Sequence, residues 1–170
     1  MTAKKPDAKQ PNQRQAKDTA GVIAPPPVLY LAGLLLGLGA DRLLNLPPLP
    51  LPAGQSSLYL GIGLGAAGFV ILLAAAGLFV KAGTNIQPHH ATTALVTGGL
   101  YRFSRNPIYL GATLVYLGLA AGLTSLGVLA LLPAVLAALH IGVIRREERY
   151  LEEKFGNAYL DYKARVRRWL

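Results

Sequence analysis

Two long stretches without a charged side chain constrain the fold of this chain more than any other feature of its sequence. No Asp, Glu, Lys or Arg occurs between Arg42 and Lys81, and none occurs between Arg105 and Arg145. A helix needs roughly 20 apolar residues to cross a bilayer, so each stretch has room for one or two crossings. The chain is 52% hydrophobic and only 15% charged, which is typical of a membrane protein.

Four hydrophobic segments are predicted to be transmembrane helices. The proline-rich residues 47–52 cannot continue the first helix, because proline removes amide donors, and Thr124 and Ser125 indicate a tight turn between the last two. The sequence thus predicts an all-α polytopic bundle with three parts: a disordered basic tail (1–24), two N-terminal transmembrane helices (25–82), and a region with a loop, a hairpin and C-terminal helices (83–170). The predicted spans are 28–46, 58–80, 108–123 and 126–144.

The distribution of basic residues predicts the orientation of these spans. The net charge of +9 is concentrated in the tail, in residues 81–105 and at the carboxyl end, whereas the other two loops carry no charge. All three basic segments lie on one side only if there are four crossings, so both termini are predicted to be cytoplasmic. Lipid phosphates, rather than nucleic acid, are the partners that such juxtamembrane charges favour.

The carboxyl segment is predicted to be an amphipathic helical region broken near Gly156, because its large apolar residues recur at steps of three or four. Two interpretations stay open, and they are compatible: the segment lies on anionic headgroups, or it packs against the preceding loop as a soluble helix. The apolar residues are Leu151, Phe155, Tyr159, Tyr162, Val166 and Trp169.

Glycines within the spans are interpreted as helix-packing positions. Gly63, Gly65 and Gly68 match a dinucleotide-binding fingerprint as text, but no strand precedes them and no acidic residue follows at the required distance. Small residues four apart allow helices to approach closely in a membrane. Three pairs have this spacing: Gly33 and Gly37, Gly61 and Gly65, and Gly118 and Gly122.

The histidines do not indicate a metal site. The side chains of the adjacent residues His89 and His90 diverge, and neither an HExxH motif nor a carboxylate cluster accompanies them. No metal is therefore expected, and the chain has no cysteine. His140 lies within a span, where an ionisable side chain either lines a site or satisfies a local hydrogen bond, and both interpretations stay open.

Nearly all chemically active side chains lie in two stretches, 95–111 (LVTGGLYRFSRNPIYLG) and 145–168 (RREERYLEEKFGNAYLDYKARVRR). They begin and end the predicted hairpin, so we expect them to meet. Gly99 to Tyr109 fits Gly-x-Tyr-Arg-x-x-Arg-(His/Asn)-Pro-x-Tyr, and Glu147 to Tyr162 fits Glu-Glu-x-x-Leu-x-x-x-Phe-Gly-x-x-Tyr-x-x-Tyr. Over about 83–168 the chain closely resembles the isoprenylcysteine carboxyl methyltransferase and phospholipid methyltransferase superfamily.

This resemblance implies an integral membrane methyltransferase that uses S-adenosylmethionine, releases S-adenosylhomocysteine and acts on a lipophilic or prenylated acceptor. It also implies a cytoplasmic-facing active site in a bacterial inner membrane, with 83–170 as the catalytic region. Glu147 and Glu148 would accept hydrogen bonds from the cofactor, and Arg102 or Arg105 would hold its carboxylate. The full expected cofactor set is Gly98, Gly99, Leu100, Tyr101, Arg102, Arg105, Asn106, Pro107, Tyr109, Glu147 and Glu148, and the expected catalytic residues are Arg165, Glu148 and Asn106.

The methyl acceptor is left open by the sequence. An isoprenylcysteine carboxylate, which Arg165 would orient, is the first expectation, and a phosphatidylethanolamine-type amine is the alternative. Asn106 stands where many members have histidine, and this substitution bears on the acceptor more than on the cofactor. An amine would have to lose a proton to His140, a glutamate or water. A non-catalytic four-span scaffold or a small exporter is the alternative from another class.

Overall fold

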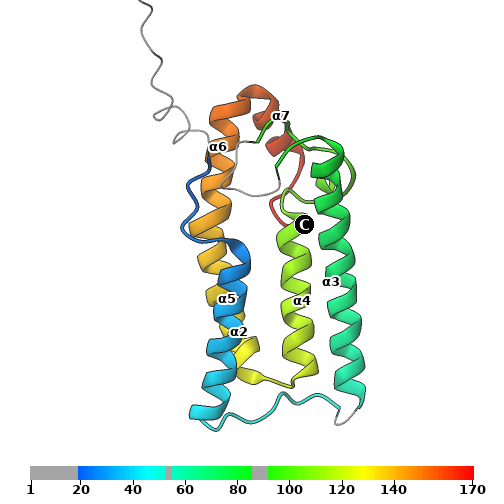
Figure 1. Cartoon of the computed structure of the whole chain (residues 1–170), viewed down its shortest axis with the longest axis vertical. Coiled ribbons are helices and arrows are strands. Elements are labelled where there is room, and N and C mark those ends of the chain that lie inside the picture. The colour runs from blue at the N-terminus through cyan, green and yellow to red at the C-terminus, as the bar shows by residue number, and fades with distance from the viewer. Residues whose placement is uncertain (1–18, 53–54, 86–91) are drawn as a thin grey trace, which may run out of the picture.

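The protein is a bundle of long helices, seen here in a computed structural model that describes residues 19–52, 55–85 and 92–170. Residues 1–18 of the predicted disordered tail lie outside these residues, as do His89 and His90, whereas residues 19–24 are described, with Val22 buried and the Ile23 amide bonded to the carbonyl oxygen of Gly142. Every regular element among the described residues is a helix, as the sequence predicts (Figure 1). They are α2 (Pro26–Leu43), α3 (Gln55–Lys81), η1 (Gly99–Arg102), α4 (Pro107–Gly122), α5 (Leu126–Leu139), η2 (His140–Ile144), α6 (Arg145–Phe155) and α7 (Asn157–Arg165).

Among the described residues, two helices are long and apolar enough to cross a membrane. One is α3, and the other is the continuous helix Leu126–Phe155 that α5, η2 and α6 form together. Helix α4 is apolar but shorter. The helix that contains the fourth predicted span continues past Ile144, because a π-helical turn, η2, carries it onward into the charged α6, and the end of the span itself stays a prediction.

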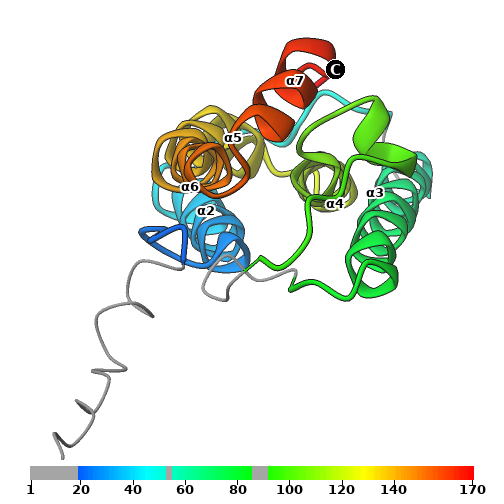
Figure 2. The same cartoon turned by 90° about the horizontal axis from the view of Figure 1, so that it is seen from above.

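The helices pack in two pairs, α3 with α4 and α2 with α5 (Figures 1 and 2). Thr124 and Ser125 do turn the chain between α4 and α5, as predicted, with φ of 48° at Thr124. The arms of this hairpin nevertheless make few contacts with one another, and each packs instead on one of the first two helices. Helices that are consecutive in the sequence, such as α4 and α5, are thus not always packing partners.

Glycines form the contact surfaces of both pairs. A Cβ atom added at Gly68 would lie 2.5 Å from the carbonyl oxygen of Gly111, and one at Gly118 would lie 2.6 Å from that of Gly61. In the other pair, a Cβ at Gly37 would lie 2.5 Å from the Cα of Val128. The predicted role of Gly33, Gly37, Gly61 and Gly118 in close packing is confirmed, and Gly68 and Gly111 extend it. A Cβ at the other two predicted positions would have room, with nothing within 4 Å at Gly65 and the Cα of Gly61 at 3.7 Å from Gly122.

Outside these narrow glycine faces, the bundle exposes large apolar side chains. Helix α3 buries only Ser57, Gly61, Gly68 and Ala75 of its 27 residues. The side chains of Phe69, Val70 and Leu73 are more than half exposed, as are several leucines of α2. An apolar surface of this extent favours contact with lipid over contact with water.

The two ends of the bundle differ in polarity. At one end, the carbonyl oxygen of Thr124 accepts a hydrogen bond from the Leu49 amide, and Asp41 accepts hydrogen bonds from the hydroxyl of Ser125 and from the Gly127 amide, so that it caps α5. At the other end lie η1, α6, α7 and the carboxyl terminus (Figure 1). Helices α6 and α7 meet at Gly156, where φ is 53°, which confirms the predicted break. The apolar face of α7 packs on the loop before α4, because Tyr159 and Tyr162 share a buried cluster with Tyr101.

Candidate active site

A cavity at the polar end of the bundle brings the two predicted stretches together. Its walls come from the end of α3, the loop after it, η1, the start of α4, and helices α6 and α7. Six of the predicted site residues line it: Tyr101, Arg105, Asn106, Tyr109, Glu147 and Glu148. The sequence-based expectation that these segments meet is therefore met by the fold.

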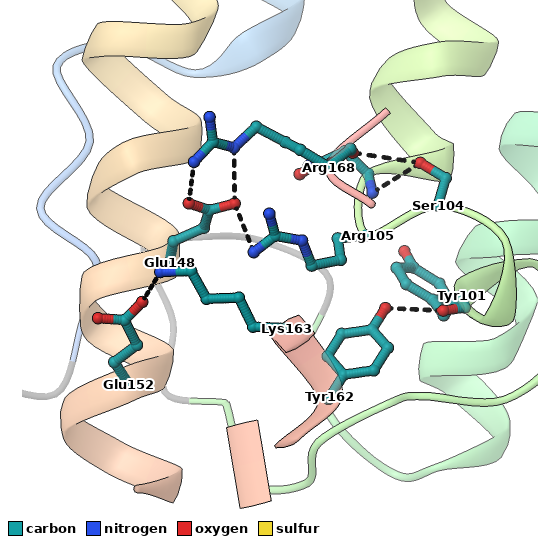
Figure 3. Close-up of polar contacts among 9 residues, drawn as sticks. Tyr101, Ser104, Arg105, Glu148, Glu152, Tyr162, Lys163 and Arg168 are labelled. Carbon is teal, nitrogen blue, oxygen red and sulfur yellow. Dashed lines mark hydrogen bonds and ion pairs between the residues drawn. The ribbon is translucent and has the colours of Figure 1, made fainter. Parts of the chain in front are cut away.

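Glu148 is held by two guanidinium groups (Figure 3). Its Oε1 lies 3.0 Å from Arg105 Nη1, and it receives a two-point contact from Arg168, with Nε at 2.9 Å and Nη2 at 2.7 Å. Burial alone would raise the pKa of Glu148, but the hydrogen bonds from Arg168 and the charge of Arg105 outweigh it and hold the pKa below its ordinary value. Glu148 is consequently a fixed carboxylate rather than a proton carrier.

Glu147, the next residue, has a different environment. Its Oε1 accepts a hydrogen bond of 2.7 Å from the hydroxyl of Tyr109, and within the described residues no salt bridge reaches it. Burial among protein atoms raises its pKa to about 7, with the nearby charge of Glu148 contributing, although the Tyr109 bond acts in the opposite direction. Glu147 can therefore exchange a proton near neutral pH.

Arg105 is almost fully buried, with only 9% of its side chain exposed. Its Nη1 is within ion-pair distance of Glu148, but neither Nη1 nor Nε makes a well-aligned hydrogen bond to any residue that the structure describes. A buried guanidinium with unsatisfied donors is costly unless another acceptor completes it. Because Arg105 also lines the cavity, that acceptor could be a ligand group such as a carboxylate.

Tyrosines form much of the remaining wall. Tyr101, Tyr109, Tyr159 and Tyr162 are buried, and the hydroxyl of Tyr162 donates to the carbonyl oxygen of Tyr101 at 2.8 Å. Burial raises the pKa of Tyr159 to about 12, so its hydroxyl stays protonated at neutral pH. Aromatic faces of this kind suit a planar base or a cation. Apolar residues complete the lining, among them Leu95, Val96, Ile108 and Leu151.

The carboxyl-terminal tail fastens the loop before α4, whose residues Arg105 and Asn106 line the cavity. The carbonyl oxygen of Arg168 accepts from Asn106 Nδ2 at 2.9 Å and from the hydroxyl of Ser104 at 3.3 Å, and that of Arg167 accepts from the Arg105 amide at 3.0 Å. Arg168 was not among the predicted site residues. The sequence motif identified its partner, Glu148, as a site residue, but it did not indicate that the tail folds back to bring Arg168 to it.

The other predicted residues do not line the cavity. Arg102 is exposed, and Arg165 is exposed with its Nε donating to the Asp161 carbonyl oxygen at 3.1 Å. The remaining four shape the loop instead. Gly98 precedes η1, Gly99 adopts a φ of 58° against Leu78, Leu100 packs on the tyrosine cluster, and Pro107 begins α4.

Comparison with known proteins places the chain in a family. Residues 56–158 match the phospholipid methyltransferase family, and the chain belongs to it. The members of this family are membrane methyltransferases that generally use S-adenosylmethionine. The match begins at the start of α3 and ends in α7, so it includes the cavity walls from α3 to α6 but not Arg168.

Two curated proteins are similar over shorter stretches. The cobalt-zinc-cadmium resistance protein CzcN of Cupriavidus metallidurans is 39% identical over 72 residues, which is 42% of this chain and 33% of that protein. An uncharacterized protein of Haemophilus influenzae is 67% identical over 27 residues, or 16% of this chain and 43% of that protein. The chain thus matches less than half the length of either relative. No solved structure matches it significantly.

Proposed function

We propose that this chain is an integral membrane methyltransferase that transfers the methyl group of S-adenosylmethionine to the polar head of a lipid-borne acceptor. The observation that carries the proposal is the meeting of two distant stretches in one cavity, where Arg105 contacts Glu148 at 3.0 Å and Tyr109 contacts Glu147 at 2.7 Å. Membership in the phospholipid methyltransferase family supports it.

The membrane topology that we propose has four crossings, with both termini and the cavity at the cytoplasmic face of a bacterial inner membrane. The basic segments after α3, around Arg105 and in α6 belong to the same end of the bundle as the cavity (Figure 1). The loops at the opposite end are uncharged beyond Asp41 and Arg42. This asymmetry is the one that the positive-inside rule associates with the cytoplasmic side.

The cavity residues fit the cofactor chemically. Arg105, with its unsatisfied donors, would hold the carboxylate, Glu147 would accept from the ammonium group, and the tyrosine rings would contact the adenine or the sulfonium. When bound, S-adenosylmethionine supplies a methyl group on a positively charged sulfur. The protein must then align the acceptor with that methyl group and exclude water. The apolar lining residues, such as Leu95 and Leu151, are suited to exclude water.

The acceptor could be a carboxylate, as in the isoprenylcysteine type, or an amine headgroup. Among the described lining residues a carboxylate acceptor finds no cation of its own, because Arg105 is assigned to the cofactor carboxylate and Arg165 is exposed with its Nε donating to the Asp161 carbonyl oxygen. One observation favours the amine. Glu147, with a pKa of about 7, could take the proton that an amine must lose before it attacks.

A labelled-methyl assay in nanodiscs would test the activity and separate the two acceptors. Methyl-labelled S-adenosylmethionine would be offered with farnesylcysteine or with phosphatidylethanolamine. A methyl ester releases labelled methanol in base, whereas an N-methyl product is base-stable. Glu147→Gln should abolish amine methylation and reduce ester formation less. Label in neither acceptor class would count against both assignments.

Binding of the product analogue tests the non-catalytic alternative. S-adenosylhomocysteine should raise the melting temperature of the detergent-extracted protein, because a ligand that binds only the folded state stabilises it. No shift at millimolar concentration, together with no transfer, would favour a four-span scaffold.

A further inference from the structure

A second hollow lies beside the cavity, on the opposite face of α6. It measures about 490 Å³, and the guanidinium-bearing side chains of Arg145, Arg146 and Arg149 line it together with Ile141 and Glu153. Its chemistry differs from that of the cavity. Three guanidinium groups face one carboxylate, and among the described lining residues Tyr150 alone is aromatic.

Of the three arginines that line this hollow, Arg146 alone donates a side-chain hydrogen bond to a described residue. Arg145 and Arg149 are exposed and make no salt bridge or hydrogen bond to the part of the chain that the structure describes. Arg146 is anchored, because its Nη1 donates to the carbonyl oxygen of Gly21 at 2.7 Å. The segment that contains Gly21 makes a second contact, in which the Ile23 amide donates to the carbonyl oxygen of Gly142 at 3.1 Å. The hollow therefore has a fixed wall.

The position of the hollow along the helix indicates which anion it meets. Arg145 is the first charged residue of the continuous helix Leu126–Phe155 and follows its apolar part, and Ile141, which is 63% exposed, precedes it by about one turn. Arg149 follows one turn later. The apolar side chain thus lies toward the membrane interior and the guanidinium groups lie where headgroup phosphates are found.

We propose that this hollow binds the phosphate of an anionic membrane lipid, with Arg145 and Arg149 contacting the phosphate oxygens and Ile141 contacting the start of an acyl chain. Arginine presents paired donors that match phosphate geometry, which a diffuse positive surface does not. The site requires no catalysis and is separate from the proposed methyl transfer. Ala20 and Tyr150 line both the hollow and the cavity, so the lipid would lie next to the candidate active site.

The test is lipid retention by the full chain, released from nanodiscs of phosphatidylcholine with one tenth phosphatidylglycerol and measured by native mass spectrometry. We expect the wild type to retain phosphatidylglycerol in preference to phosphatidylcholine. The double variant R145A/R149A should lower that preference at least roughly tenfold. The matched control is Lys81→Ala, an exposed cation at the end of α3 that lies outside the hollow, and it should retain the wild-type preference.

Three results would overturn the proposal. The double variant could retain the lipid as well as the wild type, which would remove these residues from lipid binding. Lys81→Ala could weaken retention equally, which would indicate a general electrostatic attraction. Inorganic phosphate in excess over the lipid could displace it, which would assign the hollow to a soluble anion. Unchanged melting temperatures of both variants would show that loss of lipid is not loss of fold.

Discussion

The long apolar part of the bundle and its polar end differ in how closely their elements pack. Along the length, α3 meets α4 and α2 meets α5 through glycines, so that backbone lies against backbone. At the polar end, the elements are held apart by tyrosines and by the Glu148 ion pairs, and a cavity lies among them. Glycine, which has no side chain, lets helices pack closely where water is absent. The large polar side chains at the other end keep the elements apart, and the space between them can hold a ligand.

This comparison also separates the contributions of single residues. At Gly37, Gly61, Gly68, Gly111 and Gly118 an added Cβ meets backbone that cannot move aside, whereas at Gly33 it meets the side chain of Val135. In the polar end, most changes remove a contact rather than create a clash. Substitutions along the length should therefore act on folding, and those at the polar end should act first on binding and transfer.

Gly68→Val should have the largest effect. A Cβ at this position would lie 2.5 Å from the Gly111 carbonyl oxygen and 2.7 Å from the Val115 amide nitrogen, so α3 and α4 must separate. We expect a loss of roughly 3 kcal/mol or more in the free energy of unfolding. Gly63→Val is the control, because a Cβ there meets nothing within 4 Å. Equal yields and melting temperatures for the two variants would disprove the glycine contact.

Arg105→Ala should abolish cofactor binding and reduce transfer by at least roughly a hundredfold, as expected for a buried charge-assisted contact. Arg102→Ala, in the same loop but exposed, should change either quantity less than about threefold. Isothermal titration with S-adenosylhomocysteine, together with the labelled-methyl assay, measures both. A larger loss in the Arg102 variant would return that residue to the site, as the sequence predicted.

Glu148→Gln should affect both activity and stability, so it does not test the catalytic role of Glu148 alone. The substitution should abolish transfer, but it also leaves Arg105 buried without its counter-charge. We expect a loss of roughly 2 to 4 kcal/mol in stability, which a urea or thermal melt in detergent would detect. A folded, fully stable and inactive variant would instead indicate that Glu148 serves the ligand alone.

Arg168→Ala should have an intermediate effect, because its side chain is one-third exposed and Glu148 keeps its contact with Arg105. Loss of the two-point contact should lower stability by about 1 to 2 kcal/mol and weaken S-adenosylhomocysteine binding about tenfold. Arg168→Lys restores the charge but not the paired geometry, so it should recover only part of the loss. Full binding by Arg168→Ala would show that the tail does not shape the cavity.

The pH dependence of stability should also reveal the raised pKa of Glu147. Between its ordinary pKa of 4.5 and its raised pKa of about 7, Glu147 keeps a proton in the folded state that the unfolded chain releases. Stability should therefore fall as pH rises from 4.5 to 7 and then level off. Comparing melting temperatures of wild type and Glu147→Gln at pH 5, 6, 7 and 8 isolates this contribution of a few degrees. Parallel curves for both proteins would contradict the raised pKa.

Local features of this protein could be predicted from its sequence because they depend on neighbouring residues. The charge-free stretches predict the apolar helices, the turn at Thr124 and Ser125 follows from polar residues between apolar runs, and Gly156 indicates a helix break. The motifs around Arg105 and Glu147 likewise predict a shared site. The helices, the turn and the break each depend on residues within a few turns of one another, whereas the shared site of the two distant motifs is expected because the predicted hairpin brings the chain back between them.

Only the tertiary structure decided which surfaces meet. The glycine spacing predicts close helix contacts but is the same in several helices, so it does not specify that α4 packs on α3 rather than on its hairpin partner α5. Both Arg165 and Arg168 follow the twin glutamates in the sequence, yet only Arg168 reaches Glu148, because the chain turns back after α7 ends at Arg165. Such choices depend on the sum of many weak contacts between residues distant in the sequence, and no local pattern records that sum.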